Sequence, residues 1–244
     1  MTIFVREPLS AEGIYRAALR LMDAEGIDAL TMRRLATQLG VATMSLYGHV
    51  DNKDDVLLGV VNLLVSEFQL PGPTMPPWDA LRHLIREFRR VALAHPNLVP
   101  LTMRQPPTGS EGLRSLESAL DSLRRAGLSP AQTATAYRLT ASFAIGFVSL
   151  ECGGFFRPVD VAAGAHVAPI DPSAVPRIAE MGAHLTEFDA DAEFEHGLDS
   201  LISLLSRYAG SAGQVVEGDG GSGGDVEGVD AGGHGDPDPP VSRP

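Results

Sequence analysis

The sequence predicts an all-α fold, and three observations lead to that class. Aromatic residues make up only 6% of the 244 residues, while Leu and Ala are abundant, and this composition favours helices over β-sandwiches. Apolar residues recur at helical spacing between breaks rich in Gly and Pro, and no alternating strand pattern stands out. The single cysteine, Cys152, rules out an intrachain disulfide, so the fold must rest on its hydrophobic core.

Four helices are expected in the first 70 residues. Ser10 is a typical N-cap for the first helix, and Thr31 is a typical N-cap for the second. Gly26 and Gly40 follow the last apolar residues of these two helices and are expected to end them. The expected ranges are about 10–26, 31–40, 43–50 and 52–68.

Four longer helices are expected in the rest of the chain. The run Ser129-Pro130-Ala131-Gln132 is a capping box with proline at the first helical position, and it opens the longest helix. Apolar residues at helical spacing mark the other three. The expected ranges are about 78–94, 110–126, 129–153 and 194–208, and we expect nine or ten helices in all.

Runs of proline and glycine divide the chain into domains. The stretch Leu70–Pro77 predicts a connection between an N-terminal domain over 1–69 and a helical domain over 70–209. Gly153–Pro176 is expected to form a long mobile loop. Residues 210–244 hold seven acidic residues and one basic residue, with little to bury, and predict a disordered acidic tail.

The net charge of −12, taken alone, argues against nucleic acid as a partner. The tail accounts for half of that charge, however, and residues 31–53 carry three basic residues against one acidic residue. A small basic face is therefore compatible with the sequence. No apolar run reaches the ~18 residues that span a bilayer, and the N-terminus lacks the pattern of a signal peptide. We expect a cytoplasmic protein with no membrane partner.

The third expected helix, over about 43–50, has an unusual outward face. Leu46 and Val50 lie four residues apart on its buried side, which leaves hydroxyl, thioether, aromatic and imidazole side chains facing outward. Such a face can enter the major groove of DNA and contact base edges or phosphates, while Arg33 and Lys53 clamp phosphate oxygens. The alternative is a small helical module that binds a protein. The outward side chains are those of Thr43, Met44, Ser45, Tyr47 and His49.

A longer pattern surrounds this helix and consists of Gly26-Ile27, Leu30-Thr31, Arg33, Leu35-Ala36, Leu39-Gly40-Val41, Leu46-Tyr47, His49-Val50, Asn52-Lys53 and Leu57-Leu58. It resembles the DNA-binding domain of the TetR (tetracycline-repressor) family of bacterial transcription regulators. The resemblance implies a three-helix helix-turn-helix domain whose recognition helix reads one half-site of a double-stranded operator. Gly48 stands where an aromatic residue often sits, so one contact is expected to be missing. The implied DNA-contact positions are Thr31, Arg33, Thr43, Met44, Ser45, Tyr47, Gly48, His49 and Lys53.

A second pattern consists of Trp78-Asp79, Phe88-Arg89, Ala94-His95, Arg104, Leu116-Glu117, Leu120, Leu123, Gly127-Leu128, Gly146 and Leu150-Glu151, followed by Phe194, Gly197-Leu198 and Ile202. It is similar to the regulatory domain of the tetracycline repressors. The similarity implies a ligand-binding and dimerisation domain, in which the longest helix and the last helix pair with their copies in a homodimer. The stripes expected at that interface are Leu139, Ser142, Phe143 and Gly146, and Leu198, Leu201 and Leu205.

The similarity also implies an effector site, with changed chemistry. Pro100 stands where the tetracycline repressors carry a His that coordinates the drug's magnesium, and Leu84 replaces a nearby Asn. Because the seven histidines show no metal-ligand spacing either, we expect neither a metal nor a cofactor. The effector is expected to be a small apolar or aromatic molecule. The expected lining is Phe88, Met103, Leu139, Phe143 and Phe147, with polar contacts from His83, Arg104 and Glu151; for each aromatic residue the alternative is a plain core position.

These features predict a homodimeric transcriptional regulator, and we expect a repressor that a small-molecule effector releases from its operator. One alternative is an activator without such an effector. A second alternative, from another class, is an α-helical small-molecule carrier or an enzyme that has kept the fold. The sequence contains no phosphate-binding, nucleophile-elbow or dinucleotide-binding motif, so no catalytic residue is assigned.

Overall fold

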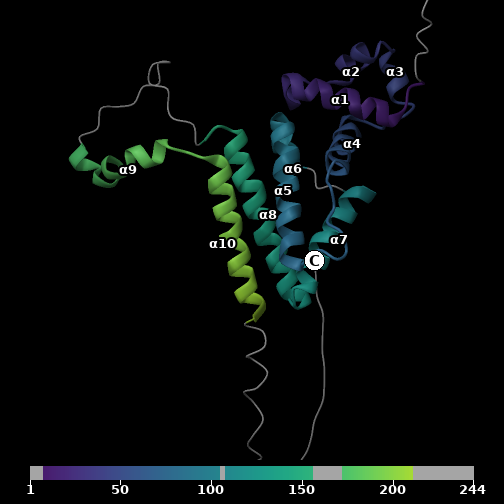
Figure 1. The fold of residues 1–244 in the computed structure, drawn as a ribbon. Coiled ribbons are helices and arrows are strands. Elements are labelled where there is room, and N and C mark those ends of the chain that lie inside the picture. Colours follow the sequence, from purple (N-terminus) through teal and green to yellow (C-terminus); the bar gives the residue numbers. More distant parts are fainter. Residues whose placement is uncertain (1–7, 105–107, 156–171, 211–244) are drawn as a thin grey trace, which may run out of the picture.

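The computed structural model describes residues 8–104, 108–155 and 172–210, and within these ranges all regular structure is helical. The all-α fold is therefore confirmed. Figure 1 shows a small N-terminal group of helices beside a set of long ones. The α-helices are α1 Ala11–Glu25, α2 Met32–Leu39, α3 Thr43–Leu46, α4 Lys53–Ser66, α5 Pro77–Ala94, α6 Val99–Arg104, α7 Ser110–Arg125, α8 Pro130–Cys152, α9 Pro176–Thr186 and α10 Ala190–Gly210. Short 3₁₀ helices are η1 Ile27–Ala29, η2 Pro96–Leu98 and η4 Pro172–Ala174.

The N-terminal helices begin and end at the capping residues that the sequence predicts. The side chains of Ser10, Thr31 and Asn52 each accept a hydrogen bond from the backbone N–H three residues further on. Gly40 follows α2 in the left-handed conformation, with a φ of 64° that glycine adopts without steric cost. Helices as short as α2 and α3 need packing partners; α2 packs against α1 and α3, and α1 packs against α4. Their common core includes Ile14, Met22, Leu35, Leu46 and Val56.

The long helices of the second half pack in layers. α5 lies beside α8, α7 packs against both, and α10 contacts α8 and α5 (Figure 1). The capping box of Ser129 and Gln132 is present at the start of α8. A buried cluster joins α5, α8 and α10 and includes Leu81, Ile85, Ala136, Phe194, Leu198, Ile202 and Leu205.

The N-terminal core continues into the second half of the chain. Val91 of α5, Leu98 of η2 and Leu101 of α6 belong to the same buried cluster as the core of α1, α2, α3 and α4. α1 also packs against η2. A shift of α4 or α6 therefore reaches the N-terminal helices through shared packing.

The helices differ from the expected ranges in two respects. α6 and α9 lie outside the eight ranges that the periodicity marked. α3 contains four residues instead of the expected eight, and residues 47–49 form a turn, because Gly48 disfavours a longer helix. Most of the expected loop (156–171) and the expected disordered tail (211–244) lie outside the described residues.

Candidate functional site

The helix-turn-helix presents an outward surface that we call the recognition surface, made of Thr31, Arg33, Thr43, Met44, Ser45, Tyr47, Gly48, His49 and Lys53. Leu46 is fully buried and Val50 is 3% exposed, whereas Met44 is 77% and Tyr47 45% exposed. Ser45 of α3 and the turn residues Gly48 and His49 are exposed as well. α3 is therefore oriented as the periodicity predicted, with its apolar anchor inward and its hydroxyl and thioether groups outward.

Three polar side chains around α2 differ in how they are held. Arg34 is bound to both carboxylate oxygens of Glu25 at 2.6 Å, and these hydrogen bonds raise the pKa of its guanidinium. The Thr31 hydroxyl accepts the N–H of Arg34 at 3.2 Å, so it caps α2. Arg33 is exposed, and within the described ranges its guanidinium makes no ion pair. Arg33 is thus available to contact a phosphate or a base edge.

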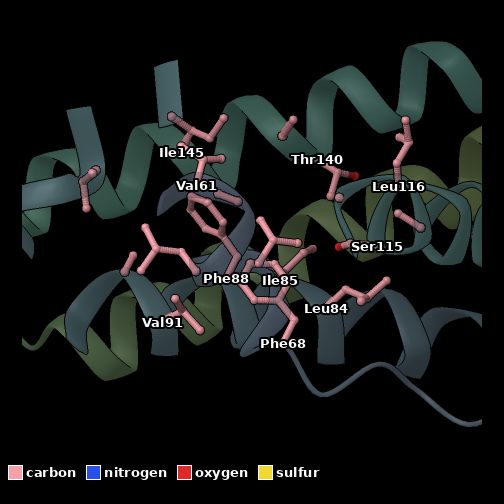
Figure 2. A pocket seen from close by; sticks show the side chains of 18 of the residues that line it. Val61, Phe68, Leu84, Ile85, Phe88, Val91, Ser115, Leu116, Thr140 and Ile145 are labelled. Carbon is pink, nitrogen blue, oxygen red and sulfur yellow. The ribbon is translucent and has the colours of Figure 1, made fainter. Parts of the chain in front are cut away.

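A cavity of about 280 Å³ lies between α4, α5, α7 and α8 (Figure 2). None of the lining residues in the described ranges is Asp, Glu, Lys or Arg, and their polar side chains are those of His95, Ser115, Tyr137 and Thr140. A concave, mostly apolar site with a few polar groups is typical of small-molecule binding. Its apolar wall includes Val61, Phe68, Leu84, Ile85, Phe88, Val91, Leu116 and Ile145.

Of the apolar residues expected to line an effector cavity, Phe88 does so, and three others do not. Phe143 and Phe147 pack around Phe194 of α10, with ring centroids 5.8 and 5.3 Å from it, and so belong to the core between α8 and α10. Leu139 is 44% exposed on the surface of α8. These residues were expected at the cavity from the resemblance to the tetracycline repressors. α8 has neighbours on two sides, however, and only the packing decides which neighbour each side chain meets.

Two polar side chains expected at the cavity are also bound elsewhere. Glu151 accepts hydrogen bonds from Arg89 at 2.6 and 2.9 Å, and both side chains are 12% exposed. Arg89 also pairs with Asp191 of α10 at 2.7 Å. The pKa of the Arg89 guanidinium is raised, chiefly by its hydrogen bonds to Glu151. His83 Nε2 lies 2.5 Å from the backbone oxygen of Gln69. Glu151 and His83 therefore hold helices together instead of lining the cavity.

The remaining two expected contacts are at the end of α6. The side chains of Met103 and Arg104 lie outside the described part of the structure, so their role in effector binding stays a prediction. The lining instead contains three hydroxyl residues that the sequence analysis did not single out, Ser115 of α7 and Tyr137 and Thr140 of α8. A signal for Thr140 was present, because it is a polar residue within an apolar run of the longest helix.

His95 connects the cavity to the N-terminal helices. Its ring lines the cavity, while Nδ1 lies 2.8 Å from Oδ2 of Asp23 and Nε2 lies 3.5 Å from Oε1 of Glu67. The side chain of Asn97 donates to the backbone oxygen of Asp23 at 2.7 Å. Because Asp23 belongs to α1 and Glu67 follows α4, a molecule that displaces the His95 ring acts on both helices.

The C-terminal end of α4 is bonded to α5. Glu87 of α5, only 8% exposed, accepts the backbone N–H of Gln69 at 2.9 Å and pairs with Arg90 at 2.9 Å. The hydrogen bonds from Arg90 lower the pKa of Glu87. Arg90 also donates to the backbone oxygen of Glu67 at 2.7 Å. These bonds fix one end of α4, while its other end adjoins the recognition surface.

Comparison with known proteins matches both halves of the chain. Residues 14–60 match the family described as bacterial regulatory proteins, tetR family, and residues 73–207 match the tetracyclin repressor-like C-terminal domain. An HTH-type transcriptional regulator of Saccharopolyspora erythraea is 33% identical over 83% of this chain and 86% of its own length. Tetracycline repressor protein class A of Escherichia coli is 28% identical over 82% of this chain and 91% of its own length.

Solved structures agree with these sequence matches. Apo ActR from Streptomyces coelicolor superposes with a TM-score of 0.73 at 31% identity, covering 84% of this chain and 98% of ActR. The complex of ActR with actinorhodin gives a TM-score of 0.73 at 30% identity, with 84% and 99% covered.

These relatives are transcriptional regulators, which favours a regulator over the carrier or enzyme considered above. Among the helices described, none has the length and apolar character that crossing a bilayer requires. The two family matches together span the recognition surface and most of the lining of the cavity. The chain therefore belongs to the TetR family and is a helix-turn-helix transcriptional regulator.

Proposed function

We propose that this regulator is a homodimeric repressor of a double-stranded operator, and that an uncharged, largely apolar effector releases it. The position of the cavity supports the proposal most directly. Val61, Leu64 and Val65 of α4 form part of its wall, and α4 begins at Lys53, beside the recognition surface. The structures of ActR with actinorhodin and with (S)-DNPA show that a relative of the same fold binds small molecules, which supports an effector site here.

The part of the recognition surface over residues 43–49 suits the major groove because it contains no Asp, Glu, Lys or Arg and its side chains are mostly small. The hydroxyl groups of Ser45 and Tyr47 can contact base edges or phosphates, and Met44 can meet a thymine methyl group. Arg33 supplies a cation for a phosphate or a guanine edge, and Gly48 adds no side chain. We assign the DNA contacts to Arg33, Thr43, Met44, Ser45, Tyr47, His49 and Lys53, with Thr31 capping α2.

Release follows from how α4 is held. In a dimer the two recognition surfaces must lie about 34 Å apart, or a multiple of that distance, to meet successive turns of DNA. An effector that pushes on Val61 and Leu64 displaces α4, and the bonds from Glu87 and Arg90 restrain its C-terminal end. The displacement is then largest near Lys53. A coupling free energy of ~1–3 kcal/mol is enough for allosteric release.

The dimer interface requires a revision of the expected stripes. Leu198 and Leu205 are fully buried within the protomer and therefore cannot meet a second copy. Leu139 and Leu204 remain 44% and 49% exposed, on α8 and α10, and the small residue Gly146 of α8 is exposed as well. We propose that these exposed faces of α8 and α10 form the homodimer interface.

A magnesium–drug chelate of the tetracycline kind does not fit the described lining. Mg²⁺ prefers oxygen ligands, but the lining contains no carboxylate, and its single imidazole, His95, is held by Asp23 and Glu67. Leu84 lines the cavity with an apolar side chain. We therefore expect that Mg²⁺ does not change ligand affinity, which calorimetry with and without Mg²⁺ can check. We also expect that tetracycline does not release the protein from its operator.

The DNA-binding proposal is tested with Arg33→Ala, measured by fluorescence anisotropy on DNA from upstream of the chain's own gene. Binding should weaken by about 1–3 kcal/mol with no change in Tm, because Arg33 is exposed. Arg34→Ala is the matched control, since Arg34 is already bound to Glu25, and it should cost less affinity. Wild-type affinity in Arg33→Ala would remove Arg33 from the recognition surface.

The dimer proposal is tested with Leu204→Arg in sedimentation experiments. This exposed substitution should give a folded monomer, and the salt dependence of DNA binding should fall to about half because half of the phosphate contacts are lost. A wild-type monomer at micromolar concentration would contradict the proposal.

If the protein is an activator without an effector, it will bind its operator, but no compound will both stabilise it and weaken that binding.

A further inference from the structure

The cavity contains a buried polar group that the fold itself leaves unused. Thr140 is 6% exposed, its side chain lines the cavity, and its Oγ1 has no hydrogen-bond partner in the structure. Leaving a buried hydroxyl unpaired costs free energy, so such groups usually have a partner, which can be a ligand.

The helix offers Thr140 a local partner that it does not take. A threonine within a helix can donate to the backbone oxygen four residues earlier, and Thr135 of the same helix does so, to Ala131 at 3.3 Å. Thr140 makes no such bond, and its hydroxyl lies at the cavity wall (Figure 2). The hydroxyl is therefore free to bond a molecule inside the cavity.

A second hydroxyl lies at the same end of the cavity. Figure 2 shows Ser115 of α7 near Thr140 of α8, while Val61, Val91 and Ile145 lie towards the opposite end. A carbonyl oxygen has two lone pairs and can accept from both hydroxyl groups at once. Apart from His95 and Tyr137, the remaining described residues of the wall offer apolar contacts to the rest of such a molecule.

The lining also restricts the charge of the occupant. Among the described residues, the lining contains no Arg or Lys to pair with a carboxylate and no Asp or Glu to pair with an amine. His95 is already held by Asp23 and Glu67. A charged ligand would lose its hydration without gaining a partner, which is strongly unfavourable.

We propose that the effector is an uncharged, flat, mostly apolar molecule with a carbonyl oxygen, and that this oxygen accepts a hydrogen bond from Thr140, with Ser115 as the second donor. Thr140 is then the residue that determines the chemical specificity of the cavity. The inference rests on the proposed function only in taking this cavity as the effector site.

The test uses 9-fluorenone and fluorene, two rigid three-ring molecules of the same shape that differ by a carbonyl in place of a methylene. Their binding to the full chain, without DNA, is measured by equilibrium dialysis. Thr140→Val removes the hydroxyl and keeps the side-chain shape. It should weaken binding of 9-fluorenone about five- to tenfold relative to fluorene, the loss expected for one hydrogen bond.

Thr133→Val is the matched control. Thr133 lies two turns earlier on α8, is 4% exposed and also has an unpaired Oγ1, but it does not line the cavity. This variant should keep the preference of the wild type for 9-fluorenone. Thr140→Ser, which retains a hydroxyl, should keep this preference as well. Thermal unfolding checks that each variant is folded.

Three results would overturn the proposal. The first is an unchanged preference in Thr140→Val, the second is an equal loss in Thr133→Val, and the third is a wild-type protein that binds neither probe. Because DNA is absent from these measurements, they remain informative if operator binding or release fails in the earlier experiments. Operator binding is likewise measured without either probe, so failure of one proposal can be distinguished from failure of the other.

Discussion

The recognition surface and the cavity are built from different kinds of neighbours. All residues of the recognition surface lie between Thr31 and Lys53, and their positions follow from caps and turns within that run. The lining of the cavity extends from Val61 to Ile145 and is drawn from α4, α5, α7 and α8. The first site depends on short-range contacts, and the second depends on how distant helices pack.

The difference is also visible in the bonds that support each site. The N-cap bonds of Ser10, Thr31 and Asn52 join residues three apart in the chain. The helices that form the cavity wall are held by pairs between distant residues instead, because Arg89 of α5 reaches Glu151 of α8 and Asp191 of α10, and Arg86 of α5 reaches Glu195 of α10. Substitutions near the recognition surface should therefore act locally, whereas substitutions near the cavity should act on several helices together.

The largest loss of stability is expected from removing the pair between Arg89 and Glu151. Arg89→Met leaves the Glu151 carboxylate, 12% exposed, without this partner, and breaking a buried pair in this way costs about 3–5 kcal/mol of unfolding free energy. Urea unfolding measures the loss. Arg86→Met is the control, because Arg86 and Glu195 are 49% and 43% exposed and exposed pairs contribute about 0–1 kcal/mol. Equal losses in the two variants would contradict this account.

A similar but more local loss is expected from Leu46→Ala. Leu46 is fully buried and anchors α3, so its truncation should cost about 2–5 kcal/mol and abolish operator binding. Binding of 9-fluorenone in the cavity should persist in the fraction that stays folded. Met44→Ala, on the exposed side of the same helix, should leave Tm unchanged. If Leu46→Ala removes both activities in folded protein, the two sites are not independent.

A smaller effect is expected at the turn between α2 and α3. Gly40 has a φ of 64°, and an L-residue in that conformation costs roughly 1–2 kcal/mol, so Gly40→Ala should lower Tm and displace α3. Gly72→Ala is the control, because no atom lies within 4 Å of the position its Cβ would occupy and its φ is not positive. Thermal unfolding of both variants would show whether the left-handed conformation is the cause.

The smallest effect concerns pH and the end of α4. Hydrogen bonds from Arg90 lower the pKa of Glu87 below its ordinary value near 4.5. The resulting stabilisation is complete above that pH and is lost as the pH falls through the lower pKa of the folded state. Glu87→Gln should therefore reduce the acid-induced loss of unfolding free energy by about 1 kcal/mol or less, which thermal unfolding over a series of pH values can measure. Glu12→Gln is the control, because Glu12 forms an exposed pair with Arg16, and it should not change this loss.

The short-range features could be read from the sequence with few errors. The caps at Ser10 and Thr31 are where they were expected, the fourth helix begins after Asn52 as expected, and Leu46 and Val50 are buried as their spacing predicted. The length of α3 was overestimated, although Gly48 was visible as a weak helix former. The assignment of single residues to DNA contacts remains a prediction that the experiments above test.

Features that depend on two helices meeting could not be read in the same way. The resemblance to the tetracycline repressors implied that Phe143 and Phe147 line the effector cavity, but the packing shows that they meet α10 instead. Glu151 was read as a ligand contact, and its actual partner, Arg89, lies 62 residues away in the chain.

The sequence by itself determined the helix boundaries near caps, the orientation of α3 and the membership of the family. Each of these depends on the chemistry of residues a few positions apart, or on a contiguous pattern that includes Leu39-Gly40-Val41. Only the tertiary structure decided which side of α8 faces the cavity and left the Thr140 hydroxyl there without a partner. The physical reason is that a helical stripe fixes the direction of a side chain relative to its own axis, whereas its neighbour depends on where the other helices pack.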